Sequence, residues 1–222
     1  MMTTEALDFI SDLKANNTTE WMHANKKRYE NYKKDYHSFI ASILFEMKKL
    51  DKSLEPLEIK NCTFRINRDI RFSKNKTPYK THIAVWLSTN KNIKNAPGYY
   101  LHIDDDESFL AGGLYCPEPI DLQKIRKEIN FFYDDLMLIL NDKKFKAEFV
   151  GISKTDTLQR PPKGFESDHP AIELLKLKSF TASKQINKLD CLNKNFAQTI
   201  AQKLIMLQPL NNFLNRALET EQ

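Results

Sequence analysis

The stretch from Arg65 to Lys80 carries the residues whose types and spacing are best suited to chemistry. Six of its sixteen side chains are cationic and only Asp69 is acidic, so the segment has a net charge of +5. The cations are Arg65, Arg68, Arg71, Lys74, Lys76 and Lys80. The whole chain also has a formal net charge of +5, so the other residues cancel. The excess positive charge is therefore local, which favours an anion site or an interaction patch.

Arginine dominates the first half of this segment, and its planar guanidinium group suits two parallel hydrogen bonds to phosphate or carboxylate. Tyr79 adds a hydroxyl group near the end of the segment. The ligand-binding residues predicted here are Arg65, Arg68, Asp69, Arg71, Lys76, Tyr79 and Lys80. A second interpretation stays open, in which the segment is a solvated loop and Asp69 pairs with a neighbouring arginine to hold a turn.

Three further residues are candidates for the same anion site. His102 lies between Leu101 and Ile103 in an alternating strand, which places it on the less apolar face. Lys163 follows two prolines in a stiff turn, and His169 stands beside a predicted helix start. For each of them a structural or solvated role is the alternative.

Other chemistry finds little support in the sequence. The acidic run 104–107 lacks the spaced ligands and the turn glycine of an EF-hand loop, so no metal ligands are predicted. Nucleotide-binding glycine motifs, a serine-nucleophile elbow and an HExxH helix are absent, and no cofactor is identified. The three cysteines are an odd number without a CxxC pair, which predicts small buried apolar residues.

Strands are expected where apolar and polar residues alternate. The pattern predicts strands over 62–66, 83–87, 99–103 and 108–111. The connection over 104–107 is too short for a parallel crossover, so it predicts an antiparallel hairpin. Long runs without proline, with apolar residues at helical spacing, predict helices on both sides of these strands.

The expected helices begin at Thr4, at Thr18 or Thr19, at Asp121, at Asp168 and at Asp190. The second is expected to reach about Leu50, and a short tail helix is expected after Pro209. This segregation predicts an α+β fold, with a mainly antiparallel sheet over about 60–112 flanked by N-terminal and C-terminal helices. No internal repeat or linker is visible, so 1–222 is expected to be a single domain.

Composition sets broad limits on the function. Hydrophobic residues make up 41% and charged residues 28% of the chain, which is typical of a soluble globular protein. No stretch approaches the roughly 20 apolar residues of a membrane-spanning helix, so no membrane association is expected. The N-terminus resembles no secretory signal, and a cytoplasmic location is expected.

The basic segment resembles a known family signature. The residues Arg65-Ile66-Asn67-Arg68-Asp69-Ile70-Arg71-Phe72, followed by Asn75-Lys76 and Tyr79, are similar to that of an uncharacterised, mainly bacterial family, domain of unknown function 2461. Stretches from Trp21 to Pro170 resemble the family as well, so the resemblance covers most of the chain. Met22 stands where the family is expected to prefer Phe, a difference that concerns packing. The resemblance implies a shared fold and supplies no activity.

Two classes of function and one alternative follow. The first is an enzyme or binding protein that holds a small phosphorylated or carboxylated molecule. The second is a nucleic-acid-associated module that uses the same segment with the helix lysines Lys26, Lys27, Lys33 and Lys34. The sequence pI of the chain, about 8.9, permits nucleic-acid binding but is below that of strongly basic nucleic-acid-binding domains. The alternative is a structural or partner-binding protein whose arginines hold its own fold.

Overall fold

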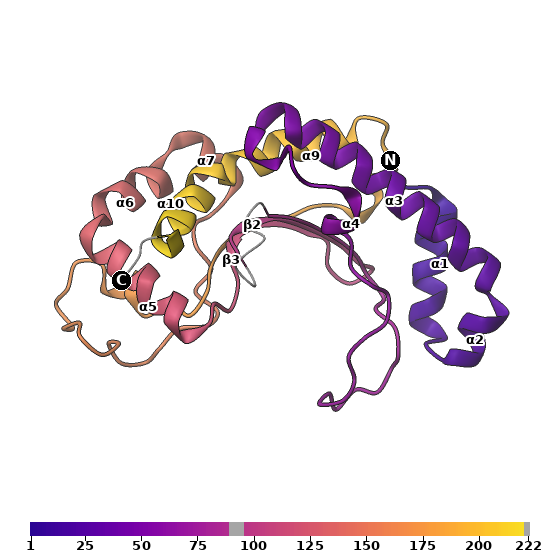
Figure 1. The fold of residues 1–222 in the computed structure, drawn as a ribbon, viewed down its shortest axis with the longest axis horizontal. Coiled ribbons are helices and arrows are strands. Elements are labelled where there is room, and N and C mark those ends of the chain that lie inside the picture. Colours follow the sequence, from indigo (N-terminus) through magenta and orange to yellow (C-terminus); the bar gives the residue numbers. More distant parts are fainter. Residues whose placement is uncertain (89–95, 220–222) are drawn as a thin grey trace. The chain divides into compact units, whose positions relative to one another are not determined.

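A four-stranded antiparallel sheet with strand order β1-β2-β3-β4 organises the fold, in a computed structural model that describes residues 1–88 and 96–219 (Figure 1). The strands are β1 (Ile83–Leu87), β2 (Gly98–Ile103), β3 (Phe109–Leu114) and β4 (Phe180–Gln185). N-terminal and C-terminal helices flank the sheet, which confirms the predicted α+β class. Residues 89–95, inside the predicted sheet region, lie outside the described residues.

The hairpin predicted over 104–107 is confirmed, because β2 and β3 are neighbours in the sheet. The strand predicted over 62–66 is wrong: α4 (Ile59–Cys62) occupies its start, and the following residues form no strand. The Phe64 N–H donates to the Tyr36 hydroxyl at 3.1 Å instead of to a neighbouring strand. Because this backbone N–H bonds to a side chain, it does not pair with a strand, although apolar and polar residues alternate over 62–66.

Strand β4 is absent from the prediction, which assigned no element between the helices expected from Asp168 and from Asp190. Its pairing with β3 depends on Gly113, which has a φ of +113°. A Cβ at Gly113 would lie 2.0 Å from the Phe180 carbonyl oxygen, so only glycine allows the two strands to approach this closely.

The described chain divides into two compact units that interleave along the sequence. Unit 1 comprises 1–87, 100–110 and 185–202, and unit 2 comprises 88–99, 111–184 and 203–222. The single domain expected from the sequence stays a prediction.

Unit 1 is built on α1 (Thr4–Ala15), α2 (Thr19–Ala24) and α3 (Lys26–Leu50), with α9 (Phe196–Leu204) mostly in this unit. Helix α1 is capped by Thr3, one residue before the predicted Thr4, and Thr18 caps α2 as predicted. The predicted helix to Leu50 is broken at Asn25, whose side-chain amide donates to the Trp21 carbonyl oxygen at 3.0 Å. Helix α1 packs on α3, where the Phe9 ring stacks on Tyr32 at 5.1 Å.

Unit 2 contains helices α5 (Pro119–Phe131), α6 (Tyr133–Asn141), α7 (Lys143–Glu148), α8 (Ile172–Leu175) and α10 (Gln208–Glu219). Helix α10 packs on α5 and α6 (Figure 1). The helix expected from Asp121 begins at Pro119 and is interrupted at Phe132. Within the described residues, no helix is long and apolar enough to cross a bilayer.

Two predicted helix starts are wrong. Helix α8 begins four residues after Asp168, because the His169 ring accepts the Ala171 N–H at 3.0 Å and holds a turn first. A 3₁₀ helix, η2 (Lys188–Leu192), replaces the start expected at Asp190. The predicted tail helix is confirmed as α10, with Pro209 in its first turn, where proline is tolerated.

Candidate functional site

Unit 1 contains a cavity of about 610 Å³ between α3, α4 and the start of the basic segment. Its wall combines aromatic rings with basic side chains. The lining residues are Tyr29, Tyr32, Lys33, Tyr36, His37, Ile59, Lys60, Thr63, Phe64, Arg65, Ile66, Asn67, Lys80, His82 and Ala84.

The charge of this wall has one sign. Four lining side chains, those of Lys33, Lys60, Arg65 and Lys80, are cationic, and no described aspartate or glutamate lines the cavity. Lys60 has an ion pair with Glu58 at 2.7 Å. The exposed Arg65 guanidinium has no hydrogen bond or ion pair to any residue that the structure describes. An anion in the cavity would therefore meet a positive wall.

Backbone pairing brings Arg65 and Lys80 to the same place, although they are fifteen positions apart. The Lys80 N–H donates to the Ile66 carbonyl oxygen at 2.8 Å, and the Arg68 N–H donates to that of Pro78 at 2.9 Å. These bonds close the base of an irregular hairpin, the purple segment after α4 in Figure 1. Burial and the Arg65 charge both lower the pKa of Lys80, because an ammonium is less stable away from water and beside another cation.

Three tyrosines of α3 form the aromatic side of the cavity. Tyr32 stacks on Tyr36 with ring centroids 5.9 Å apart, and Tyr29 stacks on Tyr32 at 6.4 Å. The Tyr36 hydroxyl donates to the Ala84 carbonyl oxygen at 2.5 Å and accepts the Phe64 N–H. Burial raises the pKa of Tyr36 to about 12, so this hydroxyl is neutral and fixes the wall instead of titrating.

The middle of the basic segment is bonded within itself. Arg68 is half-buried and donates to the carbonyl and hydroxyl oxygens of Thr77, as well as to Ser73. Arg71 is exposed and forms two hydrogen bonds with Asp69, at 3.0 and 2.7 Å.

Lys76 belongs to the same group, because its ammonium donates to the Ile70 carbonyl oxygen at 2.9 Å. None of these side chains is among the residues that line the cavity. Phe64 and Phe72, which flank these arginines, are exposed, with Phe72 at 96%.

The other predicted site residues lie in different surroundings. Tyr79 is buried, and the Asn17 side-chain amide forms hydrogen bonds with both its N–H and its carbonyl oxygen at 3.0 Å. His102 is half-buried, with Nδ1 3.0 Å from the Tyr100 hydroxyl. Lys163 and His169 belong to unit 2, where Lys163 is exposed and His169 lies 2.8 Å from the Asn130 side-chain oxygen.

Sequence reasoning missed the cavity's aromatic wall, Lys60 and the two histidines His37 and His82. The tyrosines have helical spacing, which indicates packing and gives no sign that the same rings also face a cavity. A usable signal existed for His82, which has the same strand parity as Ala84 and Trp86. It therefore extends the face of β1 opposite Ile83.

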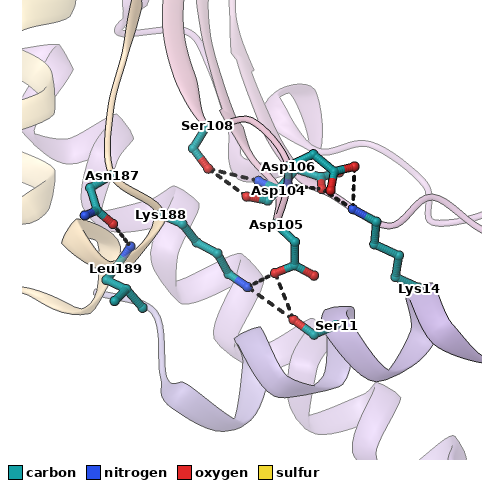
Figure 2. A network of polar contacts seen from close by, with 9 residues as sticks. All are labelled: Ser11, Lys14, Asp104, Asp105, Asp106, Ser108, Asn187, Lys188 and Leu189. Atoms are coloured by element: carbon teal, nitrogen blue, oxygen red, sulfur yellow. Dashed lines mark hydrogen bonds and ion pairs between the residues drawn. The ribbon is translucent and has the colours of Figure 1, made fainter.

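The acidic run 104–106 holds unit 1 together (Figure 2). Lys14 forms ion pairs with Asp104 at 2.9 Å and with Asp106 at 2.7 Å. The Lys188 ammonium and the Ser11 hydroxyl both donate hydrogen bonds to Oδ1 of Asp105. These ion pairs and hydrogen bonds offset the electrostatic repulsion between the three adjacent carboxylates.

Comparisons with known proteins agree with the resemblance seen in the sequence. The model of one family, described as Conserved hypothetical protein (DUF2461), matches residues 5–213. Neither the curated proteins nor the solved structures gave a significant match. Because the match covers nearly the whole chain, including every residue of the cavity, the protein belongs to the DUF2461 family.

Proposed function

We propose that the cavity of unit 1 binds a small organic anion, a phosphate or carboxylate carried on an apolar or aromatic body. The observation that carries this proposal is the wall itself, with four cations and no described acid around one cavity. A wall of one charge sign is unfavourable by itself, and a bound anion would offset the repulsion. Such a pocket suits a binding protein, or an enzyme that stabilises charge developing on its substrate.

Different lining residues would contact different parts of the ligand. Arg65 is the anchor, because its guanidinium has no partner among the described residues and can hold two oxygens at once. Lys80 supplies a second charge from the other side of the hairpin base. The stacked rings of Tyr29, Tyr32 and Tyr36 offer a flat surface to the body of the ligand.

Titration calorimetry with phenyl phosphate and with inorganic phosphate tests this assignment. Phenyl phosphate should bind more tightly, because only it contacts the tyrosines. Arg65→Gln should weaken its binding about 10- to 100-fold, which corresponds to the loss of a charge-assisted pair of hydrogen bonds. Lys80→Gln should have a smaller effect in the same direction. The matched control is Arg71→Gln, which removes the same charge from the same segment but lies outside the cavity lining.

Two results would contradict the proposal. One is equal weakening by Arg65→Gln and Arg71→Gln, which would indicate general attraction by net charge. The other is the absence of binding by phenyl phosphate and by a wider set of sugar phosphates, nucleotides and aromatic carboxylates.

Nucleic acid is the second candidate, because Lys26, Lys27, Lys33 and Lys34 are exposed on the helix that supplies the cavity wall. We expect little binding to random duplex at physiological salt. Fluorescence anisotropy that finds tight binding, weakening steeply with added salt, would favour nucleic acid over the small anion.

A further inference from the structure

The face of β1 and β2 opposite the core carries a second cluster, to which the anion proposal gives no role. His82, His102 and Asp104 each offer one ligand atom, and these atoms all lie within 4.8 Å of one another. The rings of His82 and His102 have centroids 4.4 Å apart. All three residues are half-buried and belong to unit 1.

The sheet explains why these residues meet. Within a strand, residues two positions apart share a face, and directly paired residues of neighbouring strands also share one. His82 directly precedes β1, His102 lies within the adjacent β2, and Asp104 follows two positions after His102. The residues of opposite parity, including Ile83, Leu101 and Ile103, are buried in the core. Strand pairing therefore positions the cluster, with His82 and Asp104 directly beside the ends of their strands.

We propose that His82, His102 and Asp104 form a binding site for a divalent first-row transition-metal ion such as Zn²⁺ or Fe²⁺. Two imidazole nitrogens and one carboxylate oxygen are the ligands of catalytic zinc sites and of non-haem iron sites, and they disfavour Mg²⁺ and Ca²⁺. Ligand atoms that lie roughly 2.0–2.1 Å from a tetrahedral metal ion are roughly 3.3 Å from one another. Small side-chain rotations would bring the three atoms to that spacing. Three protein ligands leave one or more positions open for water or a substrate.

Two of the three ligands, His102 and Asp104, have neighbours that orient them, as metal ligands in proteins usually do. The Tyr100 hydroxyl engages Nδ1 of His102, which leaves Nε2 for the metal. Lys14 and the Asp106 N–H both donate to Oδ1 of Asp104, which makes Oδ2 the oxygen offered to the ion. Burial lowers the pKa of His102, and that of His82 to about 4, so both rings are neutral at pH 7, as metal binding requires.

The metal site touches the anion cavity at one residue, because His82 also lines that cavity. A metal with an open position there would meet a ligand held by Arg65 and Lys80. The two proposals remain separable, since metal binding needs neither cation.

The test is a calorimetric titration of metal-free protein with Zn²⁺, followed by the visible spectrum of the Co²⁺ complex. We expect one ion per chain, with a Co²⁺ spectrum typical of four or five nitrogen and oxygen ligands. His82→Gln, His102→Gln and Asp104→Asn should each weaken Zn²⁺ binding by at least about 100-fold. His37→Gln is the matched control, because His37 lines the same cavity but is not part of the cluster. Arg65→Gln should leave Zn²⁺ affinity unchanged even if it abolishes phenyl phosphate binding.

Three outcomes would overturn the assignment. The wild type could bind no Zn²⁺ with defined stoichiometry. The histidine variants could bind like the wild type. A thiolate band in the Co²⁺ spectrum, lost in Cys116→Ser, would place the ion on the exposed cysteine instead. Circular dichroism controls for folding, and Asp104→Asn, which keeps the shape of the side chain, decides the matter if a histidine variant unfolds.

Discussion

The two ends of one basic segment differ in how their charges are used. At its base, Arg65 and Lys80 line a cavity without a described acid. Beyond the cavity, Arg71 is held by Asp69 two positions away, and Arg68 by Thr77 nine positions away. The residue types are the same, so charge density alone does not distinguish a binding site from a self-bonded loop. The difference lies in whether a local partner already occupies the cation, and the following predictions test that contrast.

The largest effect is expected from Tyr36→Phe, because the Tyr36 hydroxyl on α3 bonds to Phe64, directly before the base of the segment. Removing the hydroxyl leaves the Phe64 N–H and the Ala84 carbonyl oxygen without this partner. The free energy of unfolding should fall by about 1–3 kcal/mol, measured by urea denaturation. Tyr29→Phe is the control, because Tyr29 lines the same cavity but is only half-buried, and it should change stability by less than about 0.5 kcal/mol. Equal effects of the two variants would show that the Tyr36 bonds do not hold the base.

A smaller effect is expected from Arg68→Met, outside the cavity. This change keeps the side-chain stem but removes the bonds to Thr77 and Ser73, and should cost about 1–2 kcal/mol of unfolding free energy. Arg71→Met removes an exposed ion pair and should cost about 0–0.5 kcal/mol. Thermal and urea unfolding of both variants would measure the difference. A larger loss for Arg71→Met than for Arg68→Met would reverse the assignment of these two arginines.

The smallest effect concerns Cys62, which precedes the base. Burial raises the pKa of Cys62 and of Cys191 to about 11, so both thiols stay protonated where those of the unfolded chain ionise. Their contribution to stability is complete below pH 9 and is lost as the pH rises through about 11. Cys116 is exposed, so the burial predicted for all three cysteines is wrong there, and at pH 8 iodoacetamide should modify it first, as followed by mass spectrometry. Modification of Cys62 at the same rate as Cys116 would mean that the base opens readily.

The fold could be predicted where the signal is local. Alternation over 83–87 and 99–103 and the four-residue connection before β3 suffice for an antiparallel meander. Strand β4 could not be found in this way, because it is a strand through its pairing with β3 at Gly113. The helix breaks at Asn25 and Phe132 lie within apolar patterns of helical spacing that continue across them, so this spacing does not predict the breaks.

The site could be predicted in part. The charge excess identified Arg65 and Lys80. The partners of Arg68, Thr77 and Ser73, could not be predicted, because the hairpin returns their oxygens to it. The cavity wall and the pairing of His82 with His102 depend on which helix and which strand become neighbours. No spacing within the sequence contains that information.

The closed base of the basic hairpin has a consequence for how this segment could be re-engineered. Backbone bonds between Ile66 and Lys80, and between Arg68 and Pro78, set the separation of Arg65 and Lys80 before the chain reaches the tip. Residues inserted or deleted among 70–76 would lengthen or shorten the tip while the base keeps its register. An engineer could thus change the length of the tip, or graft a foreign sequence there, without altering the spacing of the two cations.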